Sequence, residues 1–135
     1  MSADITVFLN FLNMAVLASA PLLLATLGEI LTEKSGNLNL GVEGMMFMGA
    51  ISSLAAAYGY EHAVTVVGGI PSPLVATLLA AGAAAAAGGL GALIYAFLTV
   101  TLRANQNVTG LTLTIFGTGF ANFFGELIGK QAGGF

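Results

Sequence analysis

The sequence predicts an all-α integral membrane protein with about four transmembrane helices. Hydrophobic residues make up 57% of the 135-residue chain and charged residues only 7%, whereas about a quarter of the residues of a soluble domain are charged. The mean hydropathy is +0.95. Long uncharged stretches lie between the charged residues, and a helix needs roughly 20 apolar residues to cross the bilayer core; they cover residues 5–28, 44–60, 62–102 and 104–125. We therefore treat residues 1–135 as a single transmembrane region.

The same composition excludes most kinds of chemistry. The chain has no cysteine and one histidine, so it offers no thiolate nucleophile, no disulfide framework and no Cys/His zinc site. Three basic residues and a net charge of −3 leave no footprint for nucleic acid. We expect no catalytic residue, no metal and no cofactor, and therefore a protein that is not an enzyme.

The first predicted helix covers residues 5–31. Asn10 and Asn13 are three residues apart and therefore share one helical face. Their amides either hydrogen-bond to neighbouring helices, as polar groups in hydrocarbon do, or line a solute path. Residues 18–20 resemble a signal-peptidase site, but no basic residue precedes the apolar run and Pro21 follows it, which disfavours cleavage. We expect a helix with a kink at Pro21.

A polar, glycine-rich segment separates the first helix from the second. Residues 32–44 include three glycines and two asparagines, a composition that interrupts helices. The second predicted helix covers residues 40–60. It places Glu43 in the first turn, where the positive end of the helix dipole favours a carboxylate. Glu43 is either a helix cap or a residue with a direct functional role.

The third predicted helix covers residues 74–100 and follows a connection that contains two prolines. Small residues occupy every fourth position along it: Ala80, Ala84, Gly88, Ala92 and Ala96. Small side chains at this spacing let membrane helices approach closely. We expect this helix to pack centrally in its bundle through Ala84, Gly88 and Ala92. The alternative is an alanine-rich segment with no packing role.

The fourth predicted helix covers residues 108–127, after a polar junction at residues 103–107. Lys34 and Arg103 follow the first and third helices, so they lie on one side of the membrane, which the positive-inside rule assigns to the cytoplasm. The connection at residues 61–73 then faces outward. Lys130 would also lie outside, which goes against the rule.

Two segments carry a resemblance to a known family. The first reads GEILTEKSGNLNLGVEGMM over residues 28–46; the second reads LRANQ over residues 102–106, followed by TGL at 109–111 and FGTG at 116–119. Both resemble a family of ABC importer permeases, the membrane subunits that serve branched-chain amino acids, ribose and other simple sugars, and nucleosides. Residues 39–44 are most similar to the nucleoside and simple-sugar branch. Lys34 and Asn37 depart from the family pattern.

The resemblance implies a multi-pass permease subunit of the bacterial plasma (inner) membrane that works by alternating access. A separate ATPase subunit would supply the energy, a second permease subunit would complete the path, and an extracytoplasmic solute-binding protein would deliver a nucleoside or simple sugar. The permease itself would contribute a moving segment, and broken helices at membrane depth are tolerated where they are buried or line a cavity. The candidate for this gating element contains Gly36, Asn39, Gly41, Glu43 and Gly44.

The resemblance also implies a longer protein, of which this chain would be the amino-terminal portion, ending at residues 133–135. Asn10, Asn13 and Asn105 are candidate contacts along the solute path, and the sequence does not name the solute. The alternative function is a self-contained four-helix exporter that acts as a homo-oligomer through a membrane carboxylate, for which Glu29 is the nearest candidate. A membrane scaffold without transport activity is the third possibility.

Overall fold

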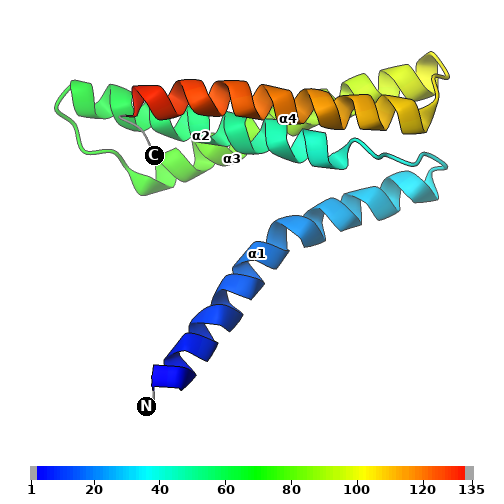
Figure 1. The fold of residues 1–135 in the computed structure, drawn as a ribbon. Helices are drawn as coiled ribbons and strands as arrows, with labels where there is room; N and C mark the ends of the chain where they lie inside the picture. Colours follow the sequence, from blue (N-terminus) through cyan, green and yellow to red (C-terminus); the bar gives the residue numbers. More distant parts are fainter. Residues whose placement is uncertain (1–2, 133–135) are drawn as a thin grey trace. The chain divides into compact units, whose positions relative to one another are not determined.

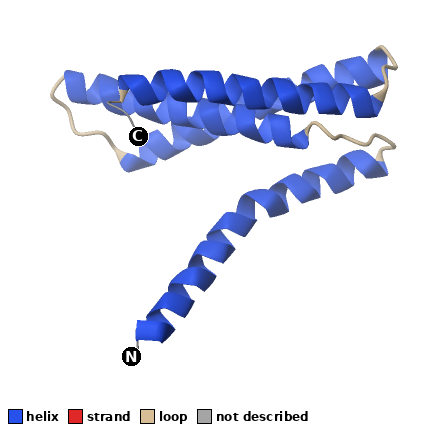
Figure 2. Ribbon diagram, viewed as in Figure 1, coloured by secondary structure: helices blue, strands red, loops and turns tan. Residues whose placement is uncertain are grey.

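The computed structural model describes residues 3–132, which form four α-helices and one π-helical turn. The helices are α1 (Ala3–Lys34), α2 (Val42–Val66), α3 (Pro73–Ala96) and α4 (Gln106–Gln131), labelled in Figure 1 and drawn in blue in Figure 2. The π-helical turn η1 (Phe97–Thr101) continues α3. The chain divides into two compact units, Met1–Leu38 and Asn39–Phe135. The expected chain end at residues 133–135 lies outside the described residues.

The first unit contains α1, which runs without interruption through Pro21 and is drawn as one bent helix in Figure 1. It ends in a Schellman motif. Gly36 adopts a φ of 85° and donates its N–H to the carbonyl of Glu33 (2.9 Å), and Asn37 donates to the carbonyl of Thr32 (3.0 Å). A left-handed φ costs glycine little, so Gly36 is placed to terminate α1.

The second unit is a three-helix bundle in which α2 packs against both α3 and α4. α2 and α4 run in parallel, because Leu40 is hydrogen-bonded to Thr114 near their beginnings and Ile51 lies opposite Gly125 further along. Figure 1 shows the two helices running in the same direction, with α3 in the opposite one. The start of α2 and the start of α4 therefore lie at one end of this bundle.

α3 packs on α2 through small residues, but along a different line from the expected stripe. Ala84 and Gly88 are half-buried, whereas Ala92 is exposed and Gly91 is buried in its place. The reason is geometric: a helix turns about 100° per residue, so residues four apart drift by about 40° at each step. The buried line therefore leaves the stripe and continues through Gly91 and Tyr95.

The central helix of this unit is thus α2 and not α3. Among the described residues, three helical segments are long and apolar enough to cross a membrane by length and composition: Asp4–Lys34, Pro73–Thr101 and Gln106–Gln131. α2 is not among them; it has Glu43 in its first turn and the polar run Tyr60, Glu61 and His62 toward its end. A crossing by α2, expected over residues 40–60, stays a prediction.

Candidate functional site: the α2–α4 joint and the α3–α4 pocket

The structure brings the two family-like segments of the second unit into contact. Residues 39–44 lie against the first half of α4, where the second segment contributes Gly110 and Gly117. We call this contact the α2–α4 joint. Its α4 side consists of Gly110, Leu113, Thr114 and Gly117, which follow an i, i+3, i+4, i+7 spacing and therefore lie on one helical face.

Glycines let the two backbones touch at the joint. A Cβ added to Gly117 would lie 2.5 Å from the Cα of Gly44, and one added to Gly44 would lie 2.7 Å from the Cα of Thr114. A Cβ on Gly110 would lie 2.8 Å from the backbone nitrogen of Leu40. Any side chain at these positions would collide with backbone atoms, which cannot rotate out of the way as a side chain can. Glycine is therefore required at these positions for steric reasons.

Asn39 organises the turn that leads into α2. Its side chain is buried, with 6% of its surface exposed. The Oδ1 atom accepts a hydrogen bond from the N–H of Gly41 (3.0 Å), and Nδ2 lies 3.9 Å from the sulfur of Met45. An asparagine that bonds the backbone two residues ahead forms an Asx turn. This turn sets the direction in which α2 begins.

Thr114 was not among the expected site residues. Its hydroxyl donates to the carbonyl of Leu40 at 2.8 Å, across the joint. Two neighbours on the same helix instead donate to their own helix, Thr112 to Val108 and Thr118 to Thr114, both at 2.8 Å. Nothing in the sequence around these three threonines tells which of them bonds to another helix. Only the position on the glycine face of α4, one turn before Gly117, distinguishes Thr114.

Glu43 lies in the first turn of α2, as expected, and its side chain is exposed. The N-cap residue Gly41 makes no side-chain capping bond, so the Glu43 carboxylate is the local charge that suits the helix dipole. Within residues 3–132, no ion pair joins Glu43 to Arg103; the ion pair found there links Lys130 to Glu126 at 2.6 Å on the exposed surface of α4.

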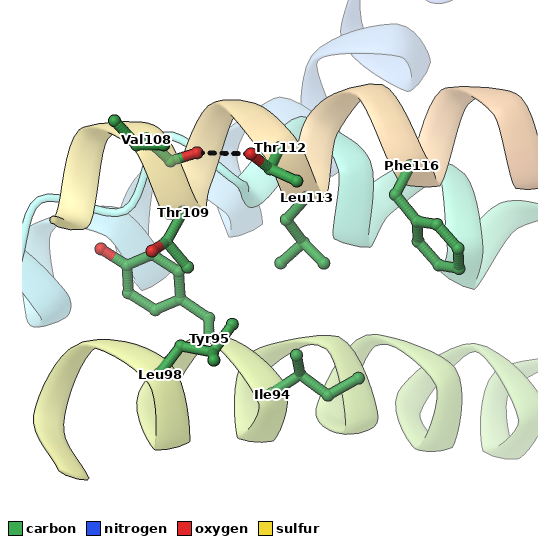
Figure 3. A pocket seen from close by; sticks show the side chains of 8 residues that line it. All are labelled: Ile94, Tyr95, Leu98, Val108, Thr109, Thr112, Leu113 and Phe116. Carbon is green, nitrogen blue, oxygen red and sulfur yellow. Dashed lines mark hydrogen bonds between the residues drawn. The ribbon is translucent and has the colours of Figure 1, made fainter. Parts of the chain in front are cut away.

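A pocket lies between the end of α3 and the first half of α4 (Figure 3). Its volume is about 400 Å³, within the range of small-molecule sites, and no charged residue lines it. Figure 3 shows Tyr95 pointing from α3 toward Thr109 and Phe116 pointing from α4 toward α3. The lining residues are Ile94, Tyr95, Leu98, Val108, Thr109, Thr112, Leu113 and Phe116.

The polar groups of this pocket are hydroxyls. Thr112 already donates its hydroxyl to Val108, which leaves its oxygen free to accept. The Thr109 hydroxyl has no hydrogen-bond partner among residues 3–132, and this residue is half-buried. A hydroxyl in apolar surroundings gains from a partner. The pocket therefore suits an uncharged ligand that offers a few hydrogen-bonding groups beside apolar surface.

The π-helical turn borders the pocket and ends α3. The N–H of Leu102 donates to the carbonyl of Phe97 (3.1 Å), and that of Ala104 to Leu98 (2.9 Å). Arg103 then adopts a φ of 53°, the one non-glycine residue with positive φ in the described chain. Asn105 caps α4 by accepting from the N–H of Val108 at 3.2 Å. Asn105, an expected path residue, is therefore the N-cap of α4 and is not among the residues that line the pocket; its place on the solute path stays a prediction.

The remaining expected residues are not among those that form the joint or line the pocket. Asn10 and Asn13 are exposed on α1, in the first unit. Gly88 is half-buried on α3, and a Cβ added there would have no heavy atom within 4 Å. Of the three expected packing residues, Ala84 is at a close approach of α3 to α2: its carbonyl oxygen would lie 3.3 Å from a Cβ added to Gly49.

Long apolar helices, glycine-backed helix packing and an uncharged pocket together define a multi-pass α-helical membrane protein. The chain belongs to the family described as the permease component of the branched-chain amino acid transport system, whose pattern matches residues 10–135. The members of this family are components of transport systems and are multi-pass plasma membrane proteins. No solved structure matches the chain.

Three curated relatives show what the chain is similar to. It is 42% identical over 117 residues to a provisionally assigned glucose ABC transporter permease protein of Haloferax volcanii, a match that covers 87% of the chain and 31% of the relative. A guanosine ABC transporter permease protein of Bacillus subtilis is 34% identical over 130 residues, covering 96% and 38%. A nucleoside ABC transporter permease protein of Lactococcus lactis is 28% identical over 113 residues, covering 84% and 33%. The chain spans about a third of the length of these relatives.

Proposed function

We propose that this chain contributes to the membrane path of an ABC importer that takes up a nucleoside or a simple sugar. The observation that carries the proposal is the family match over residues 10–135. The names of the relatives support an uncharged polar solute, since they specify glucose, guanosine and nucleosides. The partners in this proposal are a separate ATPase subunit, a second permease subunit and an extracytoplasmic solute-binding protein.

The α3–α4 pocket is the part of this chain that we assign to the solute path. Its lining carries no charge and includes the hydroxyls of Tyr95, Thr109 and Thr112. Neutral solutes need no counter-charge, and a charged group at membrane depth would be costly. The rings of Tyr95 and Phe116 offer apolar surface on the two sides of the pocket (Figure 3).

The exporter alternative is supported less well. It needs a carboxylate deep inside a membrane span, and the nearest candidate, Glu29, lies five residues before the last residue of α1, at the edge of the apolar run. The family match also favours a permease subunit over a self-contained exporter.

The test is uptake of radiolabelled guanosine and glucose by cells with the native gene and by cells from which it has been deleted. We expect deletion to abolish ATP-dependent uptake of one solute class, and the same loss when the gene of the partner ATPase is deleted. Cells are also preloaded with each solute and their efflux is followed. Unchanged uptake together with slowed efflux after deletion would contradict the importer and support the exporter.

A further inference from the structure

We propose that the α2–α4 joint is a fixed joint and not a moving gate, and that Thr114 is the positioning residue that holds it. The proposal rests on the function proposed above, because it concerns which parts of the permease move during transport. It differs from the expectation for the 36–44 segment, in which a glycine-rich break supplies the moving element. The contacts of residues 39–44 carry the argument.

The first argument is the absence of side chains between the two backbones. Gly44 and Gly117 lie against each other with no space for a Cβ on either. If the register of α4 against α2 shifted by one residue, Phe116 or Thr118 would have to enter the place of Gly117. Backbone would then have to separate to accept a side chain. Packed interfaces of this kind have discrete arrangements and do not deform continuously.

The second argument is that the joint extends beyond one glycine pair. Gly110 lies against the backbone of Leu40 and Gly41, two turns before Gly117. A Cβ on Gly41 would lie 3.1 Å from the Cδ2 atom of Leu113, which is itself buried. Two glycine contacts on one face of α4 hold both position and angle, whereas a single contact would allow rotation about it.

The third argument is the hydrogen bond across the joint. The Thr114 hydroxyl donates to the carbonyl of Leu40 (2.8 Å), and the Asn39 side chain accepts from Gly41 in the same turn (3.0 Å). The first bond ties the backbone just before α2 directly to a side chain of α4. Gly36, by contrast, ends α1 in the first unit and a Cβ there would meet nothing within 4 Å. The glycines of the 36–44 segment therefore have two different roles.

A cysteine pair tests whether the joint opens. The chain has no cysteine, so Gly41→Cys with Leu113→Cys introduces both of its thiols. The added Cβ of residue 41 lies 3.2 Å from the Cβ of Leu113, close to the separation of about 3.5–4.5 Å found in disulfides. Replacing Leu113 also removes the Cδ2 atom that a side chain at position 41 would press against. The single variants Gly41→Cys and Leu113→Cys are the controls.

Disulfide formation is measured first, in native membranes, by counting free thiols with a maleimide polymer before and after reduction. A fixed joint forms the disulfide to the same extent in the absence of ligand, with ATP, and with solute present. A yield that changes with ATP or solute by more than about threefold shows that the joint opens, and overturns the proposal. This readout does not require that the transported solute has been identified.

Uptake is measured next in the same oxidised and reduced cells. If the joint is fixed, uptake is the same with the disulfide formed as with the disulfide reduced. If the joint is a gate, uptake stops when the disulfide forms and recovers on reduction, and that result overturns the proposal. If the parent protein takes up no solute at all, the proposed function fails. The thiol count then still decides whether the joint is fixed, so the two failures are distinguishable.

The role of Thr114 is tested with Thr114→Val, which keeps the shape and removes the hydroxyl. Uptake per inserted permease falls by about threefold, the factor that corresponds to an average hydrogen bond between membrane helices. Thr114→Ser restores uptake, and the matched control Thr118→Val leaves it unchanged because Thr118 bonds within its own helix. Closing the cysteine pair in the Thr114→Val background also restores uptake. If the disulfide does not restore uptake in this background, Thr114 is not a positioning residue.

Discussion

The two faces of α4 differ in the size of the side chains that they present to the neighbouring helices. Toward α2 the helix presents Gly110 and Gly117, and backbone touches backbone. Toward α3 it presents Thr109, Thr112 and Phe116, and a pocket of about 400 Å³ remains between the helices. Small residues allow close helix approach in a membrane, while large ones keep backbones apart. One helix thus provides both a close backbone contact and a space of the size of a small ligand.

The largest effect is expected from a large side chain in the joint. Gly117→Leu forces its side chain into the backbone of Gly44, and we expect a cost of about 3 kcal/mol or more, the upper end of overpacking. The yield of detergent-stable permease in the membrane should fall at least about tenfold. Gly119→Leu is the matched control, two residues along the same helix with nothing within 4 Å of its added Cβ. Equal yields for the two variants would contradict the joint.

The α2–α3 contact should show an intermediate effect. A side chain at Gly91 meets the Cγ atom of Met45 at 3.0 Å, and a methionine can move aside. We expect Gly91→Leu to cost about 1–3 kcal/mol and to lower the same detergent-stable yield, with Gly88→Leu close to the parent. If Gly88→Leu is as damaging as Gly91→Leu, then Gly88 packs against a helix outside this three-helix unit.

Substitutions on the pocket side of α4 should change solute uptake and leave the assembly of the permease unchanged. Thr109→Val keeps the volume of the side chain but removes the hydroxyl that has no partner among the described residues. A hydrogen bond to solute contributes about 0.5–1.5 kcal/mol, so we expect uptake to fall by about 2- to 10-fold at unchanged permease yield. Phe123→Leu, on the exposed surface of α4, is the control. Normal uptake with Thr109→Val would remove this hydroxyl from the solute path.

The smallest effect is expected at Glu43, which lies in the 39–44 segment of the joint but has an exposed side chain. Its carboxylate is exposed and makes no ion pair with Arg103 within the described residues. Helix-terminal charge contributes about 0.3–1 kcal/mol. We expect Glu43→Gln to leave uptake, normalised to inserted permease, within about twofold of the parent. A loss of uptake at normal protein level would give Glu43 a direct role in transport.

The sequence predicted the helices well because bilayer thickness and charge set their limits. A helix of the structure covers each of the four segments that were expected to be helical, with ends that differ by up to six residues. That all four cross the membrane stays a prediction. The break at residues 32–44 was also expected, because glycine and asparagine interrupt helices. The meeting of the two family-like segments was not, since nothing in local sequence states which faces of two distant helices touch.

The sequence by itself determined that this chain is an α-helical membrane protein, because the cost of exposing charge and unpaired backbone to hydrocarbon leaves few alternatives. It also contained the i, i+3, i+4, i+7 pattern of Gly110, Leu113, Thr114 and Gly117, but not its partner. Tertiary structure decided that α2 is central, that Gly91 packs where Ala92 was expected, and that Thr114 bonds to Leu40. The physical reason is that helix packing depends on angle and register, and small drifts along a 3.6-residue turn move a side chain from one face to the next.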